Sequence, residues 1–244
     1  LVKTFSKEEI FEIFFNCKLI LYLLFKNDII QVNETNVNYL IDSGSKEREK
    51  FLPQYCHFFL PEIRNFIDEG LANLIEEEII NYEIKLPQNI DKERFEGEND
   101  SYICNLIRQD LIDDFISHVN KKRIRLTSKI KPSIFETNSF LIDKQPSLIE
   151  YSAFFGSIQI FHYLRLSGVE LTSTLWDYSI HSNNAEMIHL LEQNGVEVDN
   201  ETYEQLYIES IKCHHNEIAN YIECNFINQI NNNTTLNNKI SFNE

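Results

Sequence analysis

Apolar residues recur every three or four positions along most of the chain, which is the spacing of helices with one buried face. Ser6 and Glu9 precede the first dense apolar run and predict a capped helix start, because each side chain can bond the other's backbone N–H. Residues 10–25 then predict one long, largely buried helix, and residues 32–41 and 71–82 predict two more. Gly and Pro are few, at six and five, which disfavours folds with many tight turns, so the pattern predicts an all-α chain.

Residues 85–100 interrupt this pattern. Pro87, Gly97 and mixed charges occur there with little apolar periodicity, which predicts a linker or surface loop. We therefore expect an N-terminal helical region at residues 1–84. At the other end, residues 227–244 are rich in Asn and poor in apolar side chains, which predicts a disordered tail.

The stretch between these regions contains an internal repeat. Tyr151 recurs as Tyr178 and Gly168 as Gly195, each 27 residues later, and a looser third copy follows. Self-similarity at such a period is typical of repeat arrays. We expect the array to cover residues 101–226, with a degenerate first repeat at 101–146 and clearer copies at 147–173, 174–204 and 205–226.

Each copy has the pattern of two short helices joined by a tight turn. Gly156 marks that turn in the first clear copy, Asn183 takes its place in the second, and His214 takes it in the third. Gly and Asn accept the left-handed backbone conformation at low cost. Because one pair of short helices cannot bury both of its faces, neighbouring copies must stack, and stacked pairs make a solenoid with a concave surface.

Residues 147–164 and 174–191 resemble the ankyrin repeat. In the first copy Ala153, Gly156 and Leu164 match the repeat's Ala-Ala-x-x-Gly-His-x-Glu-Val-Val-x-Leu-Leu run. The opening Thr-Pro-Leu-His is not intact in either copy, and the period is shorter than the family's, which is about 33 residues. The resemblance therefore implies an ankyrin-like helical-repeat solenoid with shortened β-hairpin fingers, preceded by an N-terminal helical region.

The chain as a whole resembles the divergent ankyrin-repeat proteins expanded in some protist parasites, in which the repeats carry a domain of unknown function. This resemblance implies a noncatalytic module that binds a protein partner on the concave face. By the same analogy, the partner contacts fall on variable positions of the first helices, at Phe154, Phe155, His181, Ser182, Lys212 and Cys213. The two Phe side chains can form a binding hot spot or pack in the core, and both interpretations stay open.

Composition narrows the class of partner. A formal net charge of −16 and a pI near 4.9 argue against nonspecific binding to nucleic acid or to an anionic membrane. Five cysteines, an odd number without framework spacing, indicate reduced thiols. No signal-peptide pattern is seen, so we expect an intracellular protein, in the cytoplasm rather than the nucleus, with no nucleic-acid or membrane partner.

Two groups of residues are candidates for chemistry. Cys213, His214 and His215, with Cys224, include zinc-ligand types, but adjacent residues lack the paired spacings of zinc sites, so we expect no metal and no cofactor. His162 and His189 occupy equivalent positions on the second helices of two copies, and no nucleophile or carboxylate recurs beside them, so we expect solvent-side or interface histidines rather than a catalytic base. No phosphate-binding or hydrolase motif is present, and we expect no catalytic residue.

One short segment is basic in an otherwise acidic chain. A nuclear-import signal and a docking patch for an acidic partner are two interpretations, and a solvated inter-repeat loop is the third, which short basic runs favour. The segment contains Lys121, Lys122, Arg123, Arg125, Lys129 and Lys131.

Two other functions remain open beside the protein-binding array. One is an adaptor subunit that recruits a complex through residues 1–84, which would require these residues to fold and bind independently. The other is the regulatory fragment of a larger enzyme.

Overall fold

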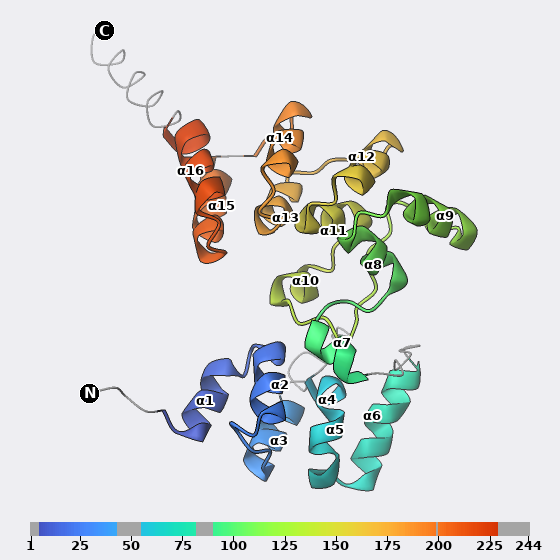
Figure 1. The fold of residues 1–244 in the computed structure, drawn as a ribbon, viewed down its shortest axis with the longest axis vertical. Coiled ribbons are helices and arrows are strands. Elements are labelled where there is room, and N and C mark those ends of the chain that lie inside the picture. The colour runs from blue at the N-terminus through green and yellow to red at the C-terminus, as the bar shows by residue number, and fades with distance from the viewer. Residues whose placement is uncertain (1–4, 43–54, 82–89, 199, 229–244) are drawn as a thin grey trace. The chain divides into compact units, whose positions relative to one another are not determined.

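The computed structural model describes residues 5–42, 55–81, 90–198 and 200–228, which are the coloured parts of the ribbon in Figure 1. These residues are mostly helical and contain no strand, so the all-α prediction is confirmed for them. A single antiparallel bridge joins Lys129 and Ser147. Residues 85–89 of the predicted linker and 229–244 of the predicted tail lie outside the described residues.

The chain divides into two compact units. Unit 1 combines residues 1–101 with residues 131–145, and unit 2 combines residues 102–130 with residues 146–244. Within the described part of the chain, no helix is both long and apolar enough to cross a membrane.

Unit 1 contains eight α-helices and one 3₁₀ turn in its described part. They are α1 (Lys7–Phe14), α2 (Lys18–Lys26), α3 (Glu34–Asp42), α4 (Tyr55–Phe58), α5 (Leu60–Ile63), η1 (Arg64–Phe66), α6 (Glu69–Asn81), α7 (Ile90–Glu96) and α10 (Ser139–Lys144).

The capped start of unit 1 is confirmed. The Ser6 hydroxyl accepts from the Glu9 N–H at 3.1 Å, and the Glu9 carboxylate accepts from the Ser6 N–H at 2.8 Å. The single helix predicted for residues 10–25 is wrong, because α1 ends at Phe14 and α2 begins at Lys18. Cys17 between them is extended, and this break lets the Lys18 side chain turn inward, where it is 3% exposed.

Aromatic and aliphatic side chains form the core of unit 1. Phe58 and Phe59 are fully buried and meet edge to face at 4.9 Å, and Tyr22 packs edge to face on Phe58 at 6.1 Å. Aromatic pairs in this geometry add to the free energy gained by burial alone. The core is continuous from α1 to α6, with Phe11, Leu21, Tyr22, Phe25, Ile30, Val37, Leu40, Cys56, Phe58, Phe59, Leu60, Ile63, Ile75 and Ile79 as its buried members.

The linker predicted at 85–100 is corrected by the structure, because residues 90–96 form α7 and pack on α2. The Arg94 guanidinium is buried at 4.3 Å from the Tyr22 ring centroid and bonds the Glu62 carboxylate at 2.6 Å. One of the charged residues that indicated a surface loop, Arg94, is therefore buried in the core of unit 1. Residues 131–145 also return to this unit, where the Thr137 hydroxyl donates to the Gly97 carbonyl at 2.8 Å.

In its described part, unit 2 is a series of helix pairs. The four pairs are α8 (Tyr102–Arg108) with α9 (Ile112–Lys122), α11 (Leu148–Phe155) with α12 (Ile158–Leu166), α13 (Leu175–His181) with α14 (Ala185–Gln193), and α15 (Asn200–Lys212) with α16 (Asn216–Ile222), followed by a π-helical turn, η2 (Glu223–Ile227). In each pair the two helices pack together, and α8, α11, α13 and α15 pack each on the next (Figure 1).

Two of the predicted repeat boundaries change. The degenerate repeat expected at 101–146 keeps α8 and α9 in unit 2, but its residues 131–145 belong to unit 1. The boundary between 204 and 205 falls inside α15, which begins at Asn200, because polar residues at the start of this helix masked its apolar spacing.

Candidate binding ridge on unit 2

The first helices of unit 2 end in the same way. Gly156, Asn183 and His214 all have a positive φ, at 67°, 50° and 59°, as expected from their matching places in the repeat. Two of these ends also close with the backbone bonds typical of left-handed helix caps, from Ser157 N to Ser152 O at 2.9 Å and from His215 N to Ser210 O at 2.8 Å. Because these turns are equivalent, the residues just before them occupy equivalent places.

Those residues make a candidate ridge, defined as Phe154, Phe155, His181, Ser182, Lys212 and Cys213. The Phe154 ring stacks on the His181 ring with centroids 5.0 Å apart and planes 24° apart. The His181 Nδ1 atom lies 3.4 Å from the Cys213 Sγ atom. Residues of three successive first helices, α11, α13 and α15, are therefore in direct contact along this ridge.

The two Phe side chains differ in exposure. Phe154 is only 8% exposed, so it belongs to the core and supports the ridge from beneath. Phe155 is half-buried and contacts the Phe154 and Tyr151 rings at 5.0 and 4.7 Å. Ser182 is half-buried and Lys212 is exposed. A partner that binds the ridge would meet Phe155, Ser182 and Lys212 rather than Phe154.

Glu209 joins the ridge, although the sequence analysis did not single it out. Its Oε1 atom lies 3.8 Å from the His181 Nε2 atom, and its Oε2 atom accepts from the Lys212 ammonium at 3.0 Å. Glu209 precedes Cys213 by four residues, and this spacing places both side chains on one face of α15. That spacing was a usable signal, but His181 comes from another helix and only the fold brings it to them.

Partial burial sets the protonation of this group. Burial lowers the pKa of His181, the Glu209 carboxylate partly offsets this effect, and nearby His215 adds to it. Burial also raises the pKa of the Cys213 thiol, and Glu209 raises it further. At neutral pH the imidazole is therefore neutral and the thiol is protonated.

The other residues of the Cys-His-His run point to different partners. The His215 Nδ1 atom bonds the Ile180 carbonyl at 2.8 Å, whereas His214 is exposed at its turn and Cys224 is exposed on η2. Among the described residues, the group of His, Cys and carboxylate side chains that converges is His181, Glu209 and Cys213.

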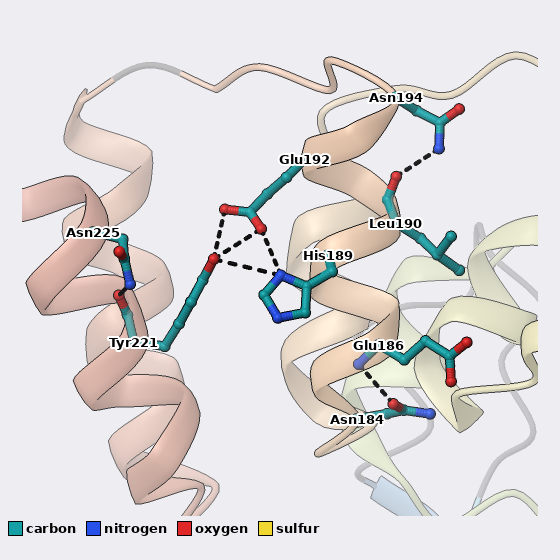
Figure 2. A network of polar contacts seen from close by, with 8 residues as sticks. All are labelled: Asn184, Glu186, His189, Leu190, Glu192, Asn194, Tyr221 and Asn225. Atoms are coloured by element: carbon teal, nitrogen blue, oxygen red, sulfur yellow. Dashed lines mark hydrogen bonds and ion pairs between the residues drawn. The ribbon is translucent and has the colours of Figure 1, made fainter.

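A second polar group links α14 to α16, and Figure 2 shows it. The Tyr221 hydroxyl lies 3.0 and 2.9 Å from the two Glu192 carboxylate oxygens, and His189 Nδ1 lies 2.9 Å from one of them. Burial and the bond to Glu192 raise the pKa of Tyr221 to about 12, so the hydroxyl stays protonated and donates. The His189 side chain is half exposed and contacts Tyr221 of the next helix pair, as expected of a solvent-side or interface histidine.

The basic segment is exposed at all six of its Lys and Arg residues. Arg123 ends α9 in the left-handed conformation, with φ at 53°. Five of the six residues belong to unit 2, whereas Lys131 begins the segment that belongs to unit 1.

Comparison with known proteins finds no family model, curated protein or solved structure that matches the chain. The site is therefore interpreted from its own geometry. The ankyrin resemblance of the repeats therefore stays a prediction.

Proposed function

We propose that the chain is a noncatalytic protein-binding module whose unit 2 is an ankyrin-like helical-repeat solenoid. The packing of α8, α11, α13 and α15, each on the next, supports this proposal, because stacked repeats bury their cores against their neighbours in this way. The recurrence of a positive φ at the end of the first helix, including Asp110 of the first pair at 51°, supports it further.

The single observation that carries the proposal is the continuity of the ridge across three helix pairs. Phe154, His181 and Cys213 contact one another in turn, so the half-buried and exposed ridge residues around them form one surface. That surface offers an aromatic ring at Phe155, a hydroxyl at Ser182 and a cation at Lys212. Such a mixture of aromatic and polar groups is typical of protein interfaces.

Affinity capture from the native cell lysate tests the ridge. The full chain is compared with Phe155→Ala/Lys212→Ala, two residues that are half-buried and exposed. Leu166→Ala is the matched control, because Leu166 is 76% exposed on a second helix, away from the ridge. A captured protein is then purified and its Kd for each variant is measured. Loss of a hot spot is expected to weaken binding by about 2 kcal/mol, or about 30-fold.

Equal melting temperatures of the three proteins are required before the Kd values are compared. Weaker binding by the ridge variant together with unchanged binding by Leu166→Ala supports the proposal. If the two variants bind a purified partner as tightly as the unaltered chain does, the ridge is not the binding surface.

A second function, an adaptor that recruits a complex through unit 1, is favoured by the separate core of that unit. Unit 1 is not limited to the predicted residues 1–84, because it also includes residues 85–101 and 131–145. Lys18 of α2, for example, donates to the Glu136 carbonyl at 3.4 Å. Proteins that the ridge variant still captures would be assigned to unit 1, and capture that depends entirely on the ridge would exclude this function.

A further inference from the structure

The group of His181, Glu209 and Cys213 offers three different donor atoms to one point. The imidazole nitrogen comes from the end of α13, the carboxylate oxygen from the last turn of α15, and the sulfur from Cys213, which directly follows α15. One ligand atom from each residue lies within 4.8 Å of the other two. The group therefore meets the first requirement of a metal site, which is convergence of ligands from elements that the fold holds in place.

The distances fit a small tetrahedral cation. Zinc binds sulfur at about 2.3 Å and nitrogen or oxygen at about 2.0–2.2 Å, so tetrahedral ligand atoms stand roughly 3.3–3.6 Å apart. The His181 Nδ1 and Cys213 Sγ atoms are 3.4 Å apart, which already satisfies this spacing. The Glu209 side chain is 35% exposed and can rotate to complete the set.

A neighbouring side chain orients one of the ligands. The stack on Phe154 fixes the plane of the His181 ring. Supporting contacts of this kind orient metal ligands and raise affinity.

We propose that His181, Glu209 and Cys213 bind one divalent cation of the zinc class, with water completing a tetrahedral site. As the sulfur binds, the thiol proton leaves to solvent, and the cation replaces it as the positive neighbour of the sulfur. Thiolate and imidazole donors favour zinc over magnesium or calcium, which prefer sites made of oxygen atoms alone. The site does not depend on the proposed protein partner, and its test requires none.

Calorimetric titration of the full, untagged and reduced chain with Zn²⁺ tests the proposal. We expect one Zn²⁺ per chain, and no comparable binding of Mg²⁺. Cys213→Ser and His181→Phe each remove one ligand, and Phe keeps a ring stacked on Phe154. Loss of a supporting residue alone weakens metal affinity by about 10–100-fold, so each of these variants is expected to weaken binding by at least about 100-fold.

Matched controls remove the same residue types nearby. Cys224→Ser replaces an exposed cysteine, and His214→Asn replaces an exposed histidine with a residue that also accepts a positive φ. Both controls are expected to bind Zn²⁺ as the unaltered chain does. Titration with Co²⁺ adds a spectroscopic measurement, since a bound thiolate gives a sulfur-to-cobalt absorption band that Cys213→Ser must lose and Cys224→Ser must keep.

Glu209→Gln provides a third variant should either ligand variant fold poorly, as judged by helicity and melting without metal. The proposal is overturned if the folded chain shows no saturable Zn²⁺ binding. It is also overturned if Cys213→Ser, His181→Phe and Glu209→Gln all bind Zn²⁺ as tightly as the two controls.

Discussion

The two units differ in what they bury besides apolar side chains. In the described part of unit 2 the buried polar side chains are all serines, three of which bond a carbonyl three residues earlier in their own helix. In unit 1 they include Lys18, His57 and Arg94. Those three hydroxyls are satisfied within their own helices, whereas the buried cations Lys18 and Arg94 take partners from other segments, at Glu136 and Glu62.

This difference corresponds to the distance along the sequence between the segments that contact one another in each unit. Unit 2 packs each helix pair on the next one, so most of its contacts join neighbouring segments. Unit 1 joins α2 to residues 131–145 through Lys18 and Glu136, which are 118 residues apart. We therefore expect the loss of a single buried cation to lower the free energy of unfolding of unit 1. We expect substitutions at the turns between helices to lower that of unit 2.

Arg94→Met gives the largest expected effect. It removes the 2.6 Å ion pair with Glu62 and the contact with the Tyr22 ring, and leaves the Glu62 carboxylate, which is 21% exposed, without its cation. Loss of one partner of a buried pair costs about 3 kcal/mol or more. The free energy of unfolding of unit 1, followed by circular dichroism in urea, is expected to fall by that amount.

The control for this prediction is the same substitution at a surface pair. Arg64 and Glu76 lie 3.2 Å apart, but their side chains are 43% and 45% exposed, so Arg64→Met is expected to cost less than about 1 kcal/mol. Trp176 is the chain's one tryptophan and lies in unit 2, so its fluorescence follows that unit. An equal shift of the Trp176 transition in Arg94→Met would show that the two units unfold together and that the comparison fails.

The same contrast explains what the sequence could predict. The capped start at Ser6 and the turns at Gly156, Asn183 and His214 depend on residues close together in the chain, and each was predicted correctly. Local periodicity cannot show that Lys18 reaches Glu136 or that Arg94 is buried under aromatic rings. The break between α1 and α2 and the helix α7 were missed for this reason.

The candidate site likewise has features that depend on local sequence and features that depend on packing between distant helices. The equivalent places of Phe154, His181 and Lys212 could be predicted from the repeat, because they depend only on its register. The convergence of His181 with Glu209 and Cys213 could not, since it depends on how α13 packs on α15. The burial of Phe154 also depends on the neighbouring ring of His181.

Alkaline pH gives a smaller effect, which is specific to unit 1. Burial lowers the pKa of Lys18 to about 8 from its ordinary 10.5. The unfolded state therefore binds more protons than the folded state between these values, and stability rises with pH there. From pH 8 to pH 9 the free energy of unfolding of unit 1 is expected to rise by about 1 kcal/mol, on a scale of about 1.4 kcal/mol per pKa unit.

Lys18→Met isolates this contribution. Burial raises the pKa of the Cys56 thiol to about 11 from 9.0, which lowers stability as the pH rises through 9, so the measurement stays between pH 8 and pH 9, where this opposing effect is smaller than that of Lys18. Urea unfolding by circular dichroism is compared at the two pH values. A rise of the same size in Lys18→Met would show that another group is responsible.

The smallest effect distinguishes two turns of unit 2. Gly156 and Gly168 have φ of 67° and 88°. Ala at either position would be destabilising by about 1–2 kcal/mol, because a residue with a Cβ atom disfavours the left-handed conformation. Ala also restricts the unfolded chain, which offsets about 0.4–1 kcal/mol of this loss. A Cβ atom at Gly156 would also lie 3.1 and 3.2 Å from atoms of Asn184 in the next helix pair, whereas a Cβ atom at Gly168 would meet nothing within 4 Å.

Gly156→Ala should therefore cost more than Gly168→Ala, by an amount on the order of 1 kcal/mol, because it also displaces a neighbouring pair. Urea unfolding followed by Trp176 fluorescence measures both variants in unit 2. Hydrogen exchange then locates the loss, which is expected to spread across α11 to α14 in Gly156→Ala and to stay at the end of α12 in Gly168→Ala. If both variants lose the same free energy, contacts between neighbouring pairs contribute nothing at this turn, and the account of unit 2 as a stack of mutually supporting pairs fails there.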